Sequence, residues 1–285
     1  MFVVLCSVAL VVSGAADSSV ALAQAANDRP LLARIGSYVE DYYARAQSIL
    51  AVETVTLQPL ARDFAFDGFP RRLVYELRLE WDPEAPDDDG PARVVRQILT
   101  VNGRPPRKGD EPRCIDPRPI SPEPLAFLLP ARRDEYVFHP GRSGDVDGRA
   151  AAVFEFRSVR AEPPHASWRD DCVSIELEGR SRGRIWADPE TAAILRLDEH
   201  LTGMVDIAVP VEQQRKGAPA YMTVERADTT IRYTPVAFDG PDETMLLPSL
   251  IESLIVVRNA GSPRLRVTQS YTNYRRFVTE GRIVR

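Results

Sequence analysis

The strict alternation of apolar and polar side chains in residues 72–82 constrains the fold more than any other feature of this sequence. Every second position carries a large apolar side chain: Leu73, Tyr75, Leu77, Leu79 and Trp81. A period of two is that of a β-strand with one buried and one wet face. Because antiparallel sheets commonly leave one face in water, the segment predicts an antiparallel sheet.

Further strands follow the same logic along most of the chain. The acidic run 83–91 predicts a loop, after which 93–101 pairs back as a second strand ending at Asn102-Gly103. Turn residues at 145–148 and 188–191 predict tight reversals, and the polar, proline-bounded segment 210–219 predicts a loop. We expect additional strands at 136–139, 151–159, 172–178, 183–187, 193–201, 221–233, 253–258 and 264–277.

Two segments have helical patterns instead. Apolar residues recur at three and four positions through 28–50, with Asp28 as N-cap and Pro30 in the first turn. Residues 121–129 predict a short helix capped by Ser121. One helix, many strands and a short helical insertion together predict an α+β domain, with the helices on one face of a curved antiparallel sheet.

The N-terminus predicts export. Residues 2–12 form an apolar run too short to span a bilayer, and the small residues that follow end in Ala21-Leu22-Ala23-Gln24-Ala25, an A-x-A cleavage site. We expect a signal peptide over 1–25, cut after Ala23 or Ala25, and a single domain over 26–285. The alternatives are a membrane anchor, which needs about 20 apolar residues, and lipidation of Cys6. The predicted location is periplasmic or secreted, with no transmembrane segment after signal cleavage.

Two cysteines remain after cleavage, Cys114 and Cys172. An oxidising compartment favours pairing them, so we predict a disulfide. The bond would close a loop of about 58 residues and contribute roughly 4 kcal/mol in the chain-entropy model. A metal site and a reactive thiol are the alternatives.

No catalytic constellation is evident, so we predict a protein that is not an enzyme and needs no cofactor or metal. The three histidines, His139, His165 and His200, are not at metal-motif spacing, and no G-x-S-x-G elbow occurs. Asp145-Val146-Asp147-Gly148 is similar to the start of a calcium loop but is interpreted as a turn, because Phe154 stands where the loop needs its glutamate. The net charge of −5 argues against nucleic acid as a partner.

The remaining candidate site is apolar. A broad sheet covered by one long helix leaves an apolar concavity for a lipid tail or another hydrophobic ligand. The candidate ligand-binding residues are Tyr75, Leu77, Trp81, Phe154, Phe156 and Ile185. The alternative is that all of them are ordinary core beneath the helix.

Two stretches resemble a known superfamily. The run from Asp147 to Phe156 and the hairpin Gly183 to Arg196 are similar to the central hairpins of the periplasmic lipoprotein carriers, the outer-membrane lipoprotein-sorting proteins, and 268–277 is similar to their last strand. This chain departs from their pattern at Ala187 and Ala192 and in the proline-rich segment 105–130. The resemblance implies a half-barrel antiparallel sheet whose helices plug an apolar hollow, with no ligand-contacting residue carried over.

The sequence therefore predicts an exported binding protein that holds an acyl chain or other hydrophobic ligand in the hollow of a curved sheet. Its expected partners are a lipid or lipoprotein, or a protein of the envelope. The alternative is a cell-envelope interaction or sensor module whose core is filled by its own side chains. A hydrolase with an unrecognised site is the third hypothesis.

Overall fold

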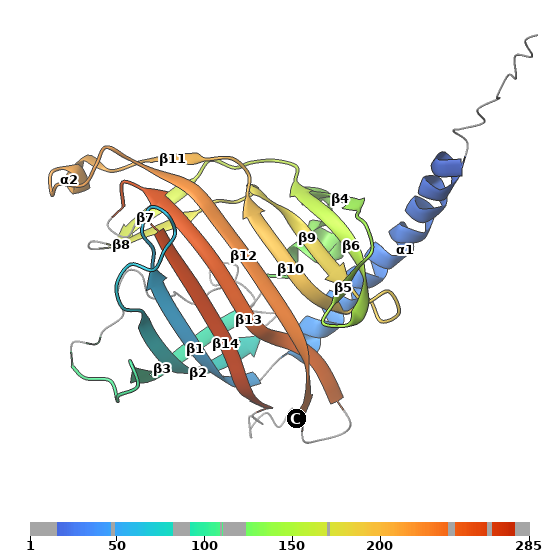
Figure 1. Ribbon diagram of the computed structural model, residues 1–285, viewed down its shortest axis with the longest axis horizontal. Coiled ribbons are helices and arrows are strands. Elements are labelled where there is room, and N and C mark those ends of the chain that lie inside the picture. Colours follow the sequence, from blue (N-terminus) through green and yellow to red (C-terminus); the bar gives the residue numbers. More distant parts are fainter. Residues whose placement is uncertain are drawn as a thin grey trace, which may run out of the picture.

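The computed structural model describes residues 16–46, 49–81, 92–108, 110, 124–169, 172–238, 243–260 and 264–276. Within these residues, one long helix and a strongly curved antiparallel sheet dominate, which confirms the predicted α+β class (Figure 1). Twelve of the described strands form that sheet, in the order β3-β2-β1-β14-β13-β12-β10-β9-β6-β4, with β11 beside β12 and β5 beside β6. A separate pair, β7 and β8, makes a small hairpin.

The strands are β1 (Ile49–Pro59), β2 (Arg71–Trp81), β3 (Ala92–Val101), β4 (Tyr136–Pro140), β5 (Gly144–Val146), β6 (Arg149–Ser158), β7 (His165–Arg169), β8 (Cys172–Glu176), β9 (Ser181–Ala187), β10 (Ile194–Leu201), β11 (Val205–Ala208), β12 (Tyr221–Phe238), β13 (Glu243–Arg258) and β14 (Arg264–Arg276). The helical elements are α1 (Ala16–Arg45), α2 (Val211–Gln214) and the 3-10 turns η1 (Ala126–Leu128) and η2 (Pro130–Glu135). The sequence missed β1, β5, β7 and β11, and it placed the start of β13 ten residues too late.

Helix α1 differs from its prediction at both ends. It begins at Ala16 rather than near Asp28, so Pro30 lies inside it, and it ends at Arg45 rather than at residue 50. The early start follows from the alanine-rich run before Asp28, because alanine has the highest helix propensity. The early end follows from β1, which takes Ile49 and Leu50 into the sheet. Signal cleavage after Ala25 remains a prediction, and it would leave Pro30 close to the new start of the helix, where its missing N–H costs little.

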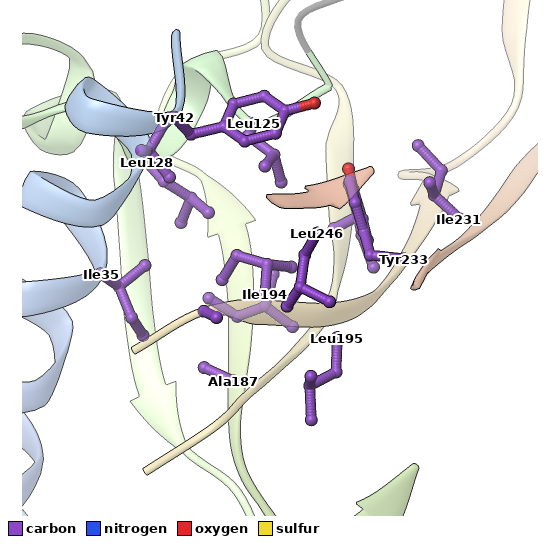
Figure 2. Packing of buried hydrophobic residues seen from close by; sticks show 14 of the residues in the cluster. Ile35, Tyr42, Leu125, Leu128, Ala187, Ile194, Leu195, Ile231, Tyr233 and Leu246 are labelled. Atoms are coloured by element: carbon purple, nitrogen blue, oxygen red, sulfur yellow. The ribbon is translucent and has the colours of Figure 1, made fainter. Parts of the chain in front are cut away.

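The short helix predicted at 121–129 is described only from residue 124 onward, where it is the 3-10 turn η1. Residues 121–123, including the expected cap Ser121, lie outside the described residues. Leu125 and Leu128 of this insertion pack against α1 on the inner face of the sheet, as Figure 2 shows.

Two of the predicted turns are confirmed. The predicted loop 83–91 lies outside the described residues, and the predicted loop 210–219 contains the short helix α2. Asp147 and Gly148, both with positive φ (52° and 82°), connect β5 to β6. The Gly148 N–H donates to the Asp145 carboxylate at 2.9 Å. Asn102 and Gly103 turn in the same way after β3, with φ of 48° and 78°. These conformations belong to tight hairpin turns, which glycine, asparagine and aspartate adopt most readily.

Candidate functional site

Two separate apolar clusters occupy the inner face of the sheet. The helix-covered cluster joins α1 and η1 to β6, β9, β10, β12 and β13, and Figure 2 shows Ile35 of α1 and Leu128 of η1 facing Ile194. The second, which we call the strand-only cluster, takes every described member from β1, β2, β3 and β14: Val55, Leu57, Leu73, Tyr75, Val101, Leu265 and Val267, with Ile98 beside them. None of the described helices contributes a side chain to it.

Strand β1 runs through both clusters on a single face. Ile49 belongs to the helix-covered cluster, whereas Val55 and Leu57 belong to the strand-only cluster. Alternate side chains of a strand share a face, so Glu53 lies between the two groups on the same side. Its side chain is fully buried.

Glu53 is the centre of a buried polar network. The Arg96 guanidinium on β3 donates to it twice, with Nε 2.6 Å from Oε2 and Nη2 3.1 Å from Oε1. From β14, Gln269 Nε2 donates to Glu53 Oε1 at 2.9 Å and the Tyr271 hydroxyl donates at 3.1 Å. Four donors thus converge on one carboxylate, which compensates for taking its charge out of water.

The network changes the pKa of Arg96 and of Tyr271. Burial works against the charged form of Arg96, but the hydrogen bonds and the charge of Glu53 outweigh it and raise the pKa of Arg96. Burial, followed by the negative charge of Glu53, raises the pKa of Tyr271 far above its ordinary value. Arg96 therefore stays charged and Tyr271 stays a hydrogen-bond donor.

Two atoms at the edge of the network have no hydrogen-bond partner within the described part of the chain. They are Arg96 Nη1, a donor, and Gln269 Oε1, an acceptor, and both are buried. An unpaired buried polar group costs about 1–3 kcal/mol. Because Arg96 and Glu53 cancel each other's charge, the pair of free atoms suits a neutral group that both accepts and donates hydrogen bonds.

Tyrosine hydroxyls line the adjoining region. Figure 2 shows the hydroxyls of Tyr42 from α1 and Tyr233 from β12 beside the apolar side chains. Burial raises the pKa of both groups, so each remains a neutral donor. The helix-covered half of the inner face therefore buries tyrosine hydroxyls among its apolar side chains.

The structure divides the six predicted ligand-binding residues. Phe154, Phe156 and Ile185 are buried in the helix-covered cluster, where Phe156 packs on Phe127 of η1 with ring centroids 4.6 Å apart. Tyr75 belongs to the strand-only cluster, and Leu77 is buried on the same strand and face. The side chain of Trp81 lies outside what the structure describes. The predicted residues therefore fall in two places, and their role toward a ligand stays a prediction.

The sequence analysis missed Glu53 and Arg96. No strand was predicted for residues 49–59, because β1 has apolar residues on both faces and a charge in its middle. The sequence does contain a pattern that indicates this contact. Glu53 and Arg96 have opposite charges, and the residues two positions before and after each of them are apolar. Two inward charges of opposite sign on nearby strands indicate a buried pair.

The remaining predictions concern the cysteines, the histidines, metal binding and membrane-spanning segments. Cys114 lies outside the described residues, as does the side chain of Cys172 at the start of β8, so the disulfide remains a prediction. Of the histidines, His200 contacts Asp228, with Nδ1 2.9 Å from the carboxylate, and Asp228 also pairs with Arg226. Across the described ranges, no group of three metal-binding side chains comes together. None of the helices in those ranges is both long and apolar enough to cross a membrane.

Comparison with known proteins shows likeness of structure alone. No family model and no curated protein matches the chain. Its structure is similar to that of a LolA superfamily protein from Nitrosomonas europaea, with 10% identity, coverage of 88% of this chain and 93% of that chain, and a TM-score of 0.35. It is also similar to a DUF1329 family protein from Desulfovibrio piger, with 12% identity, 90% and 94% coverage, and a TM-score of 0.33.

A third similar structure is an outer membrane lipoprotein-sorting protein domain from Vibrio parahaemolyticus, with 12% identity, 86% and 92% coverage, and a TM-score of 0.31. The first and third belong to the superfamily that the sequence motifs resemble. The likeness is one of overall layout, and TM-scores this low carry no statement about function.

Proposed function

We propose that this chain is a non-enzymatic binding protein of the periplasm or the secreted fraction, which holds a hydrophobic ligand such as an acyl chain against the strand-only cluster. The observation that supports this most is the composition of that cluster: buried apolar side chains on the inner face that come from strands, without a described helix. Each CH₂ group that the ligand buries there contributes about 0.8 kcal/mol.

The buried polar network suits the polar end of such a ligand. Arg96 Nη1 offers a donor and Gln269 Oε1 an acceptor next to the apolar surface. Since Glu53 already neutralises Arg96, the proposed ligand carries a neutral amide or hydroxyl at this end rather than an anion. Tyr75 and Leu77 are retained as ligand-facing residues. We assign Phe154, Phe156 and Ile185 to the core beneath α1.

Substitution of Val267 tests the proposal. Val267 belongs to the strand-only cluster and is 7% exposed. In Val267→Phe, the larger side chain would compete with the proposed ligand. We expect it to weaken binding of a fluorescent fatty-acid amide by at least about tenfold, which is 1.4 kcal/mol. Val205→Phe is the matched control, because Val205 is 4% exposed in a third cluster around β11. Equal effects of the two changes, or no binding by the unmodified protein, would count against the proposal.

A second candidate is an envelope interaction module with a self-filled core. The aromatic group around Phe156 favours it: Phe127 of η1 fills the inner face there, with Tyr136 and Phe138 at ring distances of 5.1 Å and 6.2 Å from Phe127. In that case ligand assays would stay blank, while substitutions in surface loops would abolish capture of a partner protein from an envelope extract.

A further inference from the structure

The loop between β1 and β2 exposes three phenylalanines. Phe64 is 41% exposed, Phe66 is 70% exposed and Phe69 is 96% exposed. A phenylalanine side chain that stays exposed to water lacks the stabilisation of about 1.5–3 kcal/mol that full burial would give. Three such residues within six positions form a concentrated apolar surface, which commonly marks an interaction site.

Hydrogen bonds hold the backbone of this loop in one conformation. The Asp67 N–H donates to the Pro59 carbonyl at 3.0 Å and the Ala61 N–H donates to the Ala65 carbonyl at 2.9 Å. Nε2 of the buried Gln58 side chain donates a hydrogen bond to the Gly68 carbonyl at 3.3 Å. The Asp63 carboxylate accepts one from the Ala65 N–H at 3.1 Å. The loop is thus a defined structure that points its aromatic side chains outward.

Arginines surround the phenylalanines. Arg264 and Arg266, at the start of β14, lie over the rings of Phe64 and Phe66 at 6.0 Å and 5.9 Å. The loop and the two residues that follow it also contain three arginines and two acidic residues: Arg62, Arg71 and Arg72, and Asp63 and Asp67. The loop and its neighbours therefore carry a net charge of +3 in a chain whose net charge is −5.

Further apolar side chains are exposed at the same end of the sheet. Tyr221, the first residue of β12, is 59% exposed, and Val211 of α2 is 55% exposed. The antiparallel order β1-β14-β13-β12 places the start of β12 at the end of the sheet where β1 finishes, and Figure 1 shows α2 and the β1–β2 loop toward one end of the molecule.

We propose that the loop 60–70 docks this protein on a lipid bilayer that contains anionic phospholipids. Aromatic side chains insert at the boundary of headgroups and acyl chains, while the arginines meet the lipid phosphates. The excess of positive charge selects an anionic membrane, with about 1 kcal/mol for each cation near the surface. This inference does not depend on the strand-only cluster holding a ligand.

Flotation with lipid vesicles tests the proposal. We expect the full-length mature protein to float with vesicles of phosphatidylethanolamine and phosphatidylglycerol, and to bind phosphatidylcholine vesicles much less. Because Phe66 and Phe69 contact little else, Phe66→Ser/Phe69→Ser should leave the unfolding temperature unchanged and lower vesicle partitioning at least about tenfold. Arg266→Gln should lower partitioning on anionic vesicles and reduce its dependence on salt.

Val95→Ser is the matched control. Val95 is 41% exposed, as Phe64 is, but it lies on β3 opposite Arg78, away from the loop. We expect this variant to bind vesicles as the unmodified protein does. Binding that is absent, or equal in the phenylalanine variant, would overturn the proposal, as would a loop that captures an envelope protein but no vesicles. The phenylalanine variant should keep its affinity for a fluorescent fatty-acid amide, so failure here is distinguishable from failure of the proposed function.

Discussion

At the scale of single residues, the pairing of Glu53 with Arg96 governs the inner face. Glu53 is fully buried, and the side chain of Arg96 is 9% exposed. Breaking a buried ion pair by removing one partner leaves an uncompensated charge, whereas replacing both partners by apolar groups is often neutral or stabilising. The stability of this fold should therefore depend on the pair as a unit.

We predict that Arg96→Met lowers the free energy of unfolding by about 3–5 kcal/mol, because Glu53 would lose the partner that compensates for its burial. The double variant Glu53→Leu/Arg96→Met should recover most of that loss. Urea unfolding of both variants and of the parent provides the measurement. A double variant as unstable as Arg96→Met alone would show that the cost arises from packing and not from the charge.

Glu199 on β10 gives the clearest pH dependence. Burial raises the pKa of its carboxyl above the ordinary value, with opposing contributions from Ser181 and His200. A raised carboxyl pKa means that the folded state binds its proton more tightly than the unfolded state. The associated stability is fully present below the unfolded pKa and is lost as the pH rises through the folded one.

Glu199→Gln should therefore raise the unfolding temperature at about pH 7 and change it little at about pH 4, since glutamine mimics the neutral acid. Comparing melting curves of the two proteins across this range isolates the contribution of Glu199 from that of the other carboxyls. A variant that is destabilised equally at both pH values would contradict the assignment.

At the scale of elements, Gly183 lets β9 pack between its neighbours. It lies opposite Phe156 of β6 and Glu199 of β10. A Cβ at this position would lie 1.9 Å from the Asp198 carbonyl oxygen and 2.9 Å from the Phe156 ring. Glycine is thus required here by close approach of a neighbouring strand and an aromatic ring.

Gly183→Ala should consequently lower the free energy of unfolding by about 1–3 kcal/mol or more, as overpacking does. Gly144→Ala in β5 is the control, because the nearest atom to its new Cβ is a side-chain atom of Trp186 at 3.3 Å. Thermal unfolding of the two variants compares them directly. Equal losses would mean that β9 can shift to accept a side chain.

The strands and turns differ in how well the sequence alone predicts them. Strand β2 was predicted within one residue at each end because its alternation is strict, and the turn at Asp147-Gly148 was predicted because its residues favour positive φ. Strand β1 was missed because its inward positions include Glu53. The candidate site was only half predicted: Tyr75 and Leu77 follow from alternation, whereas the Glu53–Arg96 contact depends on the order of strands, which a single sequence does not encode locally.

At the scale of the whole molecule, the length of α1 depends on processing. As described, the helix begins at Ala16, inside the predicted signal peptide. We predict that the exported protein begins at Gln24 or Ala26, so that the mature helix is shorter and has Pro30 near its start. N-terminal sequencing of protein from the periplasmic or secreted fraction measures this. A mature chain that retains residues 1–23 would contradict the export prediction.

The proposed function depends on the strand-only cluster accepting the acyl chain of a ligand. The most direct measurement is native mass spectrometry of the protein isolated from its own envelope or medium, followed by organic extraction of whatever accompanies it. We predict a bound species with an acyl chain and a neutral polar end, reduced in Val267→Phe and retained in Val205→Phe. A bare polypeptide mass in all three proteins, with no uptake of an added fatty-acid amide, would contradict this proposal.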